Sequence, residues 1–377
     1  MTLSNPFVTD PRPYKEAKSL VDFGNEVVVI AWDRKREYKK KEVINGIKIE
    51  RIWTKANYGF SPSFLPKILI FWIKAFFKVV KKNPEIIYTH DFDTAILGFL
   101  MKLFFGKKWI YDSHDLYFTY FAKNSLISKI VEKLDIFFAK YCDKLIVPTK
   151  NIGGKLSGLK EFYIEHGIKK DKILTIWNVP DLNEFLNYPK LDLKKSKKFT
   201  IGFIGGQRTL KNFILLFEAI KDEPKRYKIL FIGEGKDTEK LKKIAKEKYP
   251  DLNIEFIRNI EYKLIPNYYK VCDCIYSVYK SKKEALKNRN EIRAISTKVF
   301  ESAFLGIPVI VQENTLNADF VRKYNCGVVI KDLTVEEIKI ALEKVKKIKF
   351  NPEDIRKKWN WKNEEKKLIK IIRELNK

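Results

Sequence analysis

The sequence has few features that would indicate secretion, a membrane span or a bound metal. Only four of its 377 residues are cysteines, and Cys142, Cys272, Cys274 and Cys326 do not have the spacing of metal ligands. Lysines interrupt every apolar run before it reaches the ~20 residues of a membrane-spanning helix. The N-terminus lacks the basic and then apolar pattern of a secretory signal. These absences predict a cytoplasmic protein with reduced, buried thiols.

Acidic residues are also scarce relative to basic ones. The chain has 47 Asp and Glu against 75 Lys and Arg, which gives a net charge of +28. Such an excess is typical of proteins that meet nucleic acid, an anionic membrane or phosphate-bearing substrates, and equally of a lysine-rich genome or a hot habitat. Because the basic residues are scattered, without an arginine-rich arm or a zinc-finger spacing, we predict no nucleic-acid partner.

The length and the 45% hydrophobic content suffice for a core in each of two domains. Short apolar runs alternate with segments long enough for crossover helices, which is the pattern of a parallel sheet. A lysine-rich stretch, residues 187–198, interrupts the pattern before it restarts. We therefore predict two tandem doubly wound α/β domains over residues 1–190 and 199–350, followed by a helical tail over residues 351–377 that can pack back on the first domain. The predicted strands are residues 27–30, 86–89, 109–112, 145–148, 199–204, 228–232, 254–257, 274–278 and 309–311.

Two strand-to-helix junctions of the second domain carry glycines where ligands bind in such sheets. In "FIGGQRTLK" a predicted strand runs through Gly205 and Gly206 into a helix, with Arg208 and Lys211 at its start. Glycines, free amides and two cations at a helix start suit a diphosphate. In "FIGEG" a second strand ends at Gly233. Either glycine pattern alone is equally typical of an ordinary turn.

A third junction, "STKVFESAFLGIPVIV", holds a lysine and a glutamate three residues apart. If Ser296 or Thr297 caps a helix, Lys298 and Glu301 share one face of it and look out of the ligand end of the sheet. Lysine can meet phosphate, and the carboxylate can accept two hydrogen bonds from a diol such as ribose. The alternative is an ordinary ion pair on a helix surface. Three such junctions in one sheet favour a nucleotide site.

These motifs, taken in order with "NYYKVCDCIYSVY", resemble the retaining glycosyltransferases of family 4, which have the GT-B fold. In the first domain, "EAKSLVDFGNEVVVIAWDR", "NPEIIYTHD", "KWIYDSHDLYF" and "DKILTIWNVPD" are similar to segments of the same family. The resemblance covers nearly the whole chain. It implies two Rossmann-like domains facing a cleft, with a nucleotide-sugar held by the second and a glycan or lipid-linked acceptor held by the first.

The resemblance also implies roles for single residues of the donor site. Glu301 matches the glutamate that holds the ribose, and Lys298 matches the lysine three positions before it. Lys211 and Arg208 match the basic pair that grips the diphosphate.

In the first domain, His114 matches a histidine near the transferred sugar, and we predict that this residue is catalytic as a neutral imidazole that orients the sugar. His90 matches a second histidine at a strand end, which is as consistent with a structural role as with acceptor binding. Asp10 and Arg12 lie in the loop expected on the acceptor side.

Two positions depart from the family pattern. Where the family has a first glutamate, eight residues before Glu301, this chain has Arg293, and Glu291 and Glu284 are out of register. The loop after the first strand lacks the family's glycine pair, and the strand itself is short or begins upstream.

The implied mechanism needs neither a protein nucleophile nor a cofactor, so we predict catalysis by positioning and by stabilisation of the leaving diphosphate. Asp91 and Asp93 form a D-x-D pattern, which holds a metal in a different glycosyltransferase fold. Because that pattern is common by chance, we predict that no metal is required.

One segment gives information about where in the cell the protein meets its acceptor. From Phe64 to Lys82, aromatic and aliphatic residues alternate with lysines, as in a helix at a membrane surface. A core-packed helix with a solvated lysine stripe is the favoured alternative. If the segment lies at a membrane surface, the acceptor is lipid-linked and the chain makes peripheral contact with the inner face of the membrane; otherwise the acceptor is a glycan or a lipid-linked sugar met without this helix.

Two other function classes remain open. A non-catalytic subunit that keeps the fold as a binding scaffold would explain Arg293. A sugar-nucleotide epimerase would share the two domains and the donor site. The sequence does not name the base, the sugar or the acceptor.

Overall fold

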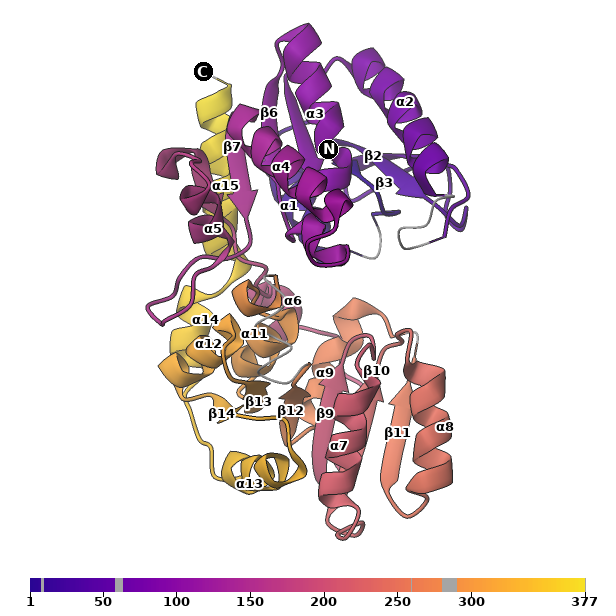
Figure 1. Ribbon diagram of the computed structural model, residues 1–377, viewed down its shortest axis with the longest axis vertical. Coiled ribbons are helices and arrows are strands. Elements are labelled where there is room, and N and C mark those ends of the chain that lie inside the picture. Colours follow the sequence, from indigo (N-terminus) through magenta and orange to yellow (C-terminus); the bar gives the residue numbers. More distant parts are fainter. Residues whose placement is uncertain (8–9, 58–63, 259, 280–289, 377) are drawn as a thin grey trace. The chain divides into compact units, whose positions relative to one another are not determined.

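The computed structural model describes residues 1–7, 10–57, 64–258, 260–279 and 290–376, and it divides the chain into two α/β units (Figure 1). Unit 1 comprises Met1–Lys150, Leu159–Trp177 and Glu364–Lys377, and unit 2 comprises Asn151–Gly158 and Asn178–Asn363. The change of unit therefore falls after Trp177, earlier than residues 187–198, and the predicted tail is divided between the two units.

Residues 187–198 contain neither helix nor strand, as their composition indicated, but they belong to unit 2. The side chain of Asn267 explains this placement. Its Nδ2 donates to the carbonyl oxygen of Pro189 and its Oδ1 accepts from the amide of Leu191, both at 2.9 Å. A lysine-rich composition indicates irregular structure, but it does not indicate which of the two units contains the segment.

Unit 1 is built on an eight-stranded sheet in the order β3-β4-β2-β1-β5-β6-β7-β8. Its strand pairs are parallel except for the hairpin of β3 and β4. The four strands predicted in this half are present, whereas the hairpin and β8 were not predicted. The first strand, of two residues, is as short as the sequence indicated. The strands are β1 (Thr2–Leu3), β2 (Val28–Asp33), β3 (Lys41–Ile44), β4 (Ile47–Trp53), β5 (Ile86–His90), β6 (Lys108–Asp112), β7 (Lys144–Val147) and β8 (Ile173–Thr175).

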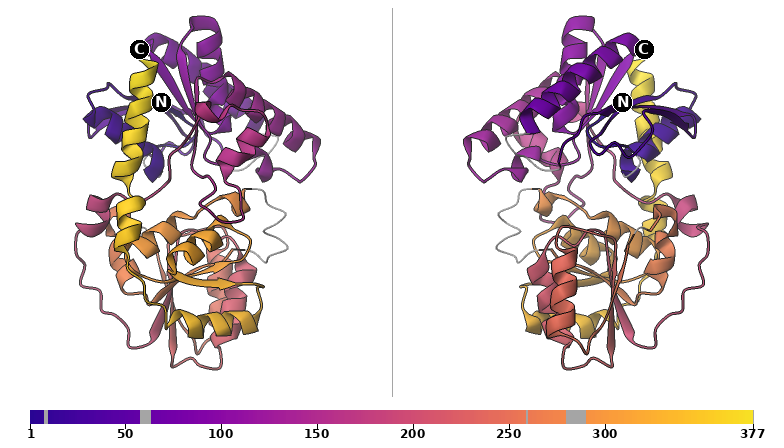
Figure 2. Two further views of the ribbon diagram at one scale, coloured as in Figure 1. Left: turned by 90° about the vertical axis from the view of Figure 1, so that its left-hand side faces the viewer. Right: turned by 90° about the vertical axis from the view of Figure 1, so that its right-hand side faces the viewer.

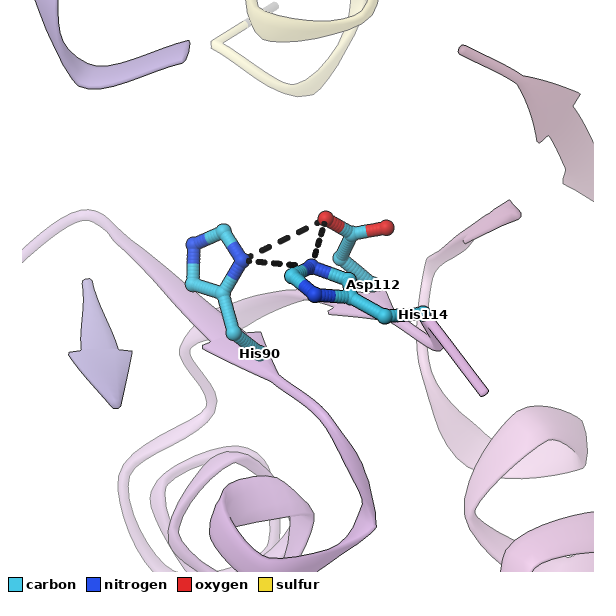
Figure 3. A group of neighbouring side chains, drawn as sticks. All are labelled: His90, Asp112 and His114. Carbon is cyan, nitrogen blue, oxygen red and sulfur yellow. Dashed lines mark hydrogen bonds and ion pairs between the residues drawn. The ribbon is translucent and has the colours of Figure 1, made fainter. Parts of the chain in front are cut away.

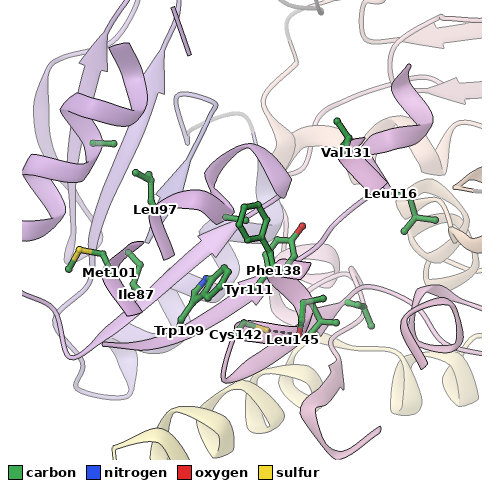
Figure 4. Packing of buried hydrophobic residues seen from close by; sticks show 14 of the residues in the cluster. Ile87, Leu97, Met101, Trp109, Tyr111, Leu116, Val131, Phe138, Cys142 and Leu145 are labelled. Carbon is green, nitrogen blue, oxygen red and sulfur yellow. Dashed lines mark hydrogen bonds between the residues drawn. The ribbon is translucent and has the colours of Figure 1, made fainter. Parts of the chain in front are cut away.

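Helices cover both faces of this sheet. Alternate strand residues such as Trp109 and Tyr111 pack into one large core with α2–α5 (Figure 4). Tyr88 points to the opposite face, where its hydroxyl donates to Glu16 of α1 at 2.7 Å. The helices are α1 (Pro11–Asp22), α2 (Leu65–Lys82), α3 (Phe92–Phe105), α4 (Leu126–Tyr141), α5 (Leu159–Glu165) and α15 (Trp361–Leu375), with 3-10 turns η2 (Tyr117–Tyr120) and η3 (Lys170–Lys172). The helix predicted near the C-terminus is thus confirmed as α15.

The register of β5 and β6 positions the residues that follow them. His90 and Asp112, the last residues of the two strands, are register partners. Because parallel strands end at the same edge of a sheet, their side chains and the following His114 come together there.

Unit 2 has a six-stranded sheet, in the order β11-β10-β9-β12-β13-β14, whose described strand pairs are all parallel (Figure 2). Ile204 and Ile232 end β9 and β10 as register partners, so the glycine loops leave the sheet side by side. The strands are β9 (Phe199–Ile204), β10 (Tyr227–Ile232), β11 (Asn253–Ile257), β12 (Cys274–Ser277), β13 (Val309–Gln312) and β14 (Gly327–Ile330). The helices are α6 (Leu182–Leu186), α7 (Leu210–Ile220), α8 (Thr238–Lys248), α9 (Ile265–Lys270), α11 (Thr297–Phe304), α12 (Leu316–Tyr324), α13 (Val335–Val345) and α14 (Glu353–Lys358), with 3-10 turns η4 (Tyr262–Leu264) and η5 (Glu291–Arg293).

None of the helices in the described part of the chain combines the length and the apolar character that crossing a bilayer requires.

Candidate active site

Two glycine loops lie against each other at the carboxyl ends of β9 and β10. Gly205 and Gly233 have φ angles of +123° and +101°, a region that favours glycine. A Cβ at Gly233 would lie 3.1 Å from the carbonyl oxygen of Gly205, and one at Gly235 would lie 2.3 Å from that of Gln207. The glycines at these two strand ends therefore allow, in part, the close approach of one loop to the other.

Gln207 joins the two loops, a role that the sequence did not indicate because glutamine is usually exposed. Its side chain is fully buried. Nε2 donates to the carbonyl oxygen of Gly205 at 2.9 Å, and Oε1 accepts from the hydroxyl of Thr238 at 2.5 Å. Its carbonyl oxygen accepts from the amide of Asp237 at 3.0 Å. Gln207 thus holds the glycine loops in one arrangement.

Of the three predicted cations, Arg208 lies in the first loop, Lys211 in the first turn of α7 and Lys298 on α11. The side chains of Arg208 and Lys211 are exposed, and neither has a carboxylate partner among the residues that the structure describes. Lys298 is buried, and its Nζ lies 3.9 Å from the ring centroid of Phe203 and 4.8 Å from that of Tyr279. The same Nζ would lie 3.2 Å from a Cβ placed on Gly205, so Lys298 reaches the loop. Cations and strand-end amides of this kind can bind an anionic group.

Glu301, one turn after Lys298, is held by two tyrosines. Tyr262 donates to its Oε1 at 2.8 Å and Tyr269 to its Oε2 at 2.6 Å. Burial first, and then the charge of Glu301, raise the pKa of both phenols, so they stay protonated donors. Each carboxylate oxygen keeps a further lone pair, which leaves Glu301 able to accept from a diol.

Lys298 and Glu301 are both at least nine-tenths buried, and their orientation toward the ligand end of the sheet stays a prediction. Ser296 is the N-cap residue of α11, and all the residues of this helix from Lys298 to Phe304 are buried. The alternative of an ordinary helix-surface ion pair was wrong. Within the described residues, Lys298 packs on aromatic rings and Glu301 bonds to tyrosines, so the two charges do not pair with each other.

In unit 1 a buried network of charges surrounds Asp112. Nε2 of His114 lies 2.8 Å from its Oδ2, and Nδ1 of His90 lies 3.3 Å from the same oxygen (Figure 3). The guanidinium of Arg12 donates to both carboxylate oxygens, at 2.8 and 3.1 Å, and to the carbonyl oxygen of Ile176 at 2.7 Å. The carboxylate of Asp112 therefore fixes the position of both histidines and of the arginine.

These contacts give the two histidines different charges. Burial alone would lower the pKa of His114, but the carboxylates of Asp91 and Asp112 raise it to about 10. Burial lowers the pKa of His90 to about 4, although Asp112 opposes the shift. Burial also raises the pKa of Glu16, beside Arg12, to about 8. At neutral pH His114 is thus an imidazolium, contrary to the neutral ring expected from the sequence, and His90 is neutral.

The comparisons with known proteins bear on both units. Residues 14–184 match the model of Glycosyltransferase Family 4, and residues 185–369 match the model of Glycosyl transferases group 1. The two models meet without a gap and leave only short ends unmatched. The chain belongs to the family 4 glycosyltransferases. An uncharacterized glycosyltransferase of Methanocaldococcus jannaschii is 27% identical over 367 residues, which cover 90% of this chain and 88% of that one.

Solved structures show that this glycosyltransferase has the GT-B fold. A sucrose-phosphate synthase from Thermosynechococcus elongatus superposes with a TM-score of 0.77 at 14% identity, covering 99% of this chain and 98% of that one. HepE of Anabaena, in complex with UDP and glucose, superposes with a TM-score of 0.69 at 11% identity, covering 98% of each chain. At these identities the likeness concerns the fold alone.

Asp10, Arg12 and His90, which we expected on the acceptor side, are held by contacts within unit 1. Asp10 is the N-cap of α1 and accepts from the amide of Arg12 at 3.3 Å. Arg12 lies in the first turn of that helix, 2% exposed, and is engaged by Asp112 and Glu16. His90 is buried and stacks on Tyr88 with 4.5 Å between ring centroids. The expectation of a loop through Arg12 was wrong, because helix α1 begins at Pro11, and the acceptor-side role of Asp10 and Arg12 stays a prediction.

Asp91 is a site residue whose role the sequence did not show. Its Oδ1 accepts from the amide of His114 at 3.1 Å, and its Oδ2 lies 3.6 Å from Nδ1 of the same residue. Its backbone φ of +63° is costly for a residue with a side chain, and such strain is concentrated at functional sites. Among the described residues the Nδ1–H of His114 has no acceptor within hydrogen-bond distance, so it can donate to a ligand.

Arg293 occupies η5, in the place of the family's first glutamate. Glu291 begins the same turn, and Glu284 lies outside the described residues.

One side-chain group in the described part of the chain has the geometry of a metal site. One ligand atom from each of His90, Asp112 and His114 lies within 4.8 Å of the others. The group does not fit a cation well, because metal ligands must be deprotonated and Arg12 already occupies both oxygens of Asp112. Asp93 is buried and accepts from the hydroxyl of Tyr117 at 2.8 Å. That transfer needs no metal stays a prediction.

Proposed function

We propose that this glycosyltransferase takes its sugar from a nucleotide-sugar held by unit 2 and transfers it with retention of the anomeric configuration. The observation that carries the proposal is the arrangement of α11. Lys298 reaches the glycine loop at Gly205, while Glu301, one turn further, offers a carboxylate held by two tyrosines. A cation and a carboxylate one helical turn apart suit a diphosphate and a ribose. A protein of the same fold, HepE, binds UDP and glucose, which agrees with this reading.

The donor diphosphate would be bound by Arg208, Lys211 and Lys298 together with the amide of Gly206, because the amide of Gly205 donates to the carbonyl oxygen of Ile232. These groups stabilise the leaving diphosphate more as its charge grows, which lowers the barrier rather than only the free energy of binding. Because they are held in place before the reaction, little reorganisation is needed when the bond breaks.

The chemistry we propose is attack on the face from which the diphosphate leaves. The acceptor hydroxyl oxygen forms a bond to the anomeric carbon, and the bond from that carbon to the diphosphate oxygen breaks with its electron pair. The hydroxyl proton passes to the leaving diphosphate oxygen. His114, as an imidazolium anchored through Nε2 on Asp112, donates its Nδ1–H to a sugar hydroxyl and orients the ring.

For the acceptor we propose a glycan or a lipid-linked sugar, with peripheral contact to the inner face of the membrane through residues 64–82. The supporting observation is that α2 leaves several apolar side chains of this segment exposed, among them Leu69, Ile73 and Phe77. In the favoured alternative of a core-packed helix with a lysine stripe, these positions would be polar.

A panel of nucleotide-sugars tests the proposal. Incubation with each donor should release free nucleotide slowly, and EDTA should leave the release unchanged. Interconversion of the sugars would instead show an epimerase, and absence of nucleotide binding would show a scaffold. Loss of activity on chelation with rescue by manganese would contradict the metal-free mechanism. Product analysis by NMR then reports the anomeric configuration, and inversion would contradict retention.

A further inference from the structure

We propose that one face of unit 1, formed by α2, α3 and α4, docks on an anionic lipid bilayer. The inference rests on the membrane contact proposed above and extends it from one segment to a three-helix surface. The exposed apolar side chains of this face come from all three helices: Leu65, Leu69, Ile70, Ile73 and Phe77 of α2, Leu103, Phe104 and Phe105 of α3, and Leu126, Ile127, Ile130 and Leu134 of α4. We call this set the apolar face.

Helix α2 carries an exposed apolar stripe opposite its buried one. Residues at a spacing of four, from Leu65 to Phe77, are between 51% and 66% exposed, while Ile68 and Phe71 pack into the core. A helix that meets only water has polar residues on its outer face. The exposed stripe of α2 is therefore expected to contact an apolar medium other than the protein core.

Helix α3 is apolar all round, which is typical of a helix covered on every side. Its two charged residues are withdrawn from the outer face: Asp93 is buried, and Lys102 is paired with Asp143 at 2.6 Å. At its C-terminal end Leu103 and Phe104 are 59% and 66% exposed. In the described part of the chain nothing covers these side chains.

Ring contacts join the three helices into one surface. Phe76 of α2 lies 6.2 Å from Phe105 of α3, and Phe99 of α3 lies 5.2 Å from Phe137 and 5.7 Å from Tyr141 of α4, measured between ring centroids. The apolar sides of α2 and α4 thus turn toward α3. At ~100° per residue, the lysines of α2 and α4 lie on the outer flanks of this surface. These lysines are Lys67, Lys74, Lys81, Lys129, Lys133 and Lys140, whereas Lys78 and Lys82 of α2 pair with Glu50 of β4.

Charge identifies the partner as an anionic bilayer. Helix α2 has no acidic residue, and Asp135 of α4 is buried while Glu132 is half-buried. An apolar strip flanked by lysines on both sides inserts at an interface while the lysines meet anionic headgroups. A second copy of the chain would bring the same basic flanks against each other, and like charges oppose such pairing. The apolar face therefore fits lipid better than itself.

Flotation of the full chain with vesicles tests the proposal without any donor. The chain should float with vesicles of phosphatidylcholine and phosphatidylglycerol, bind pure phosphatidylcholine weakly, and lose binding as salt rises. The variant Leu69→Ser/Ile73→Ser/Phe77→Ser should bind at least about tenfold more weakly. Because these side chains are more than half exposed, the core stays intact. Lys74→Glu/Lys129→Glu should weaken binding by about fivefold or more for each lysine.

Matched variants in unit 2 serve as controls. Ile340→Ser removes an apolar side chain that is 48% exposed on α13, and Lys240→Glu/Lys246→Glu reverses two exposed lysines of α8. Both should bind like the unchanged chain. Equal binding to the two kinds of vesicle, no binding at all, or self-association that the serine variant abolishes would each overturn the proposal. A chain that floats but transfers no sugar would contradict only the proposed function.

Discussion

Glu301 and His114 are both charged groups that the fold removes from water and then holds with specific partners. Glu301 accepts from two phenols, and His114 keeps its proton between two carboxylates. A buried charge is costly unless it is paired and hydrogen-bonded. Both side chains are therefore held in position before a ligand binds. Each is expected to act on the ligand in addition to its contribution to the fold.

Replacing Glu301 by alanine should weaken nucleotide binding by about 1–3 kcal/mol, the range for losing a charged hydrogen-bond acceptor. Calorimetric titration with the nucleotide of the active donor measures the change. Because the substitution also strands the hydroxyls of Tyr262 and Tyr269, the variant Tyr262→Phe/Tyr269→Phe is the control for the tyrosine bonds alone. Unchanged affinity in Glu301→Ala, with the fold intact by circular dichroism, would remove this residue from the donor site.

Replacing His114 by alanine should lower turnover about a hundredfold or more while nucleotide affinity changes little, since orientation of the sugar acts chiefly in the transition state. Turnover and affinity are measured on the same preparations. His90→Ala is the matched comparison, because His90 shares the contact with Asp112 but is buried and uncharged. Near-normal turnover, or loss of nucleotide binding in step with thermal stability, would show that His114 is structural.

The proton of His114 makes stability depend on pH. The folded-state pKa of about 10 lies above the unfolded value near 6.5, so between these values the folded chain binds more protons than the unfolded chain. Its contribution is fully present below pH ~6.5 and is lost as pH rises through about 10. Denaturant unfolding should show stability falling over this window, and less so in His114→Gln. An equal change of unfolding free energy with pH in both proteins would show that a group other than His114 binds the extra proton.

At the scale of elements, the proposed donor site of unit 2 depends on the contact between two strand-end loops. The backbone atoms of Gly235 and Gln207 pack so closely that only glycine fits at position 235. Gln207 bonds to both loops and is itself buried. The loops therefore act as one piece, and Arg208, which follows Gln207, takes its position from it.

Gly235→Ala should separate these loops and weaken nucleotide binding, because its Cβ would lie 2.3 Å from the carbonyl oxygen and 2.4 Å from the amide nitrogen of Gln207. An overpacked site of this kind typically costs about 1–3 kcal/mol. Thermal unfolding and nucleotide titration measure the two effects. Gly106→Ala is the control for nucleotide affinity: a Cβ there meets nothing within 4 Å, and although its φ of +62° favours glycine and the variant should lose some thermal stability, its affinity should be unchanged. Wild-type affinity in Gly235→Ala would show that the loop contact does not shape the donor site.

On the scale of the whole molecule, the end of the chain completes the unit in which the chain begins. Most of α15 belongs to unit 1, where Glu364 accepts from the amide of Trp177 at 2.9 Å. Ser19 of α1 donates to Glu365 at 3.0 Å. The helix thus joins segments more than 300 positions apart in the chain, and unit 1 cannot close until the whole chain has been made.

Removal of residues 364–377 should therefore unfold unit 1 and leave unit 2 able to bind nucleotide. The deletion takes away four buried side chains, Leu368, Ile369, Ile371 and Ile372. At about 1.5–3 kcal/mol each, their loss amounts to roughly 6–12 kcal/mol, which is comparable with the whole stability of a domain. Lys366→Ala/Lys370→Ala, which alters only exposed positions of the helix, should behave like the unchanged chain. A truncated protein with two intact unfolding transitions would contradict this role of α15.

The sequence by itself determined the alternation of strands and helices, because a buried strand needs a short apolar run and a crossover needs a fixed minimum length. It therefore predicted most strands of both sheets, and it also indicated Gly205 and Gly233 as residues at strand ends and Lys298 and Glu301 as residues near a helix start. The strands that it missed, such as β3 and β8, are short or half polar, so their patterns do not stand out from those of loops.

Only the tertiary structure decided which charges meet. Arg12 and Asp112 are 100 positions apart, and they pair because α1 and β6 are brought to the same edge of the sheet. The charge of His114 follows from that pairing, since its pKa depends on burial and on carboxylates that no local pattern places beside it. Helical spacing put Lys298 and Glu301 on one face, but packing against Phe203 and the tyrosines turned that face inward. Local periodicity fixes elements, whereas the partners of a buried charge depend on contacts between residues that are distant in the chain.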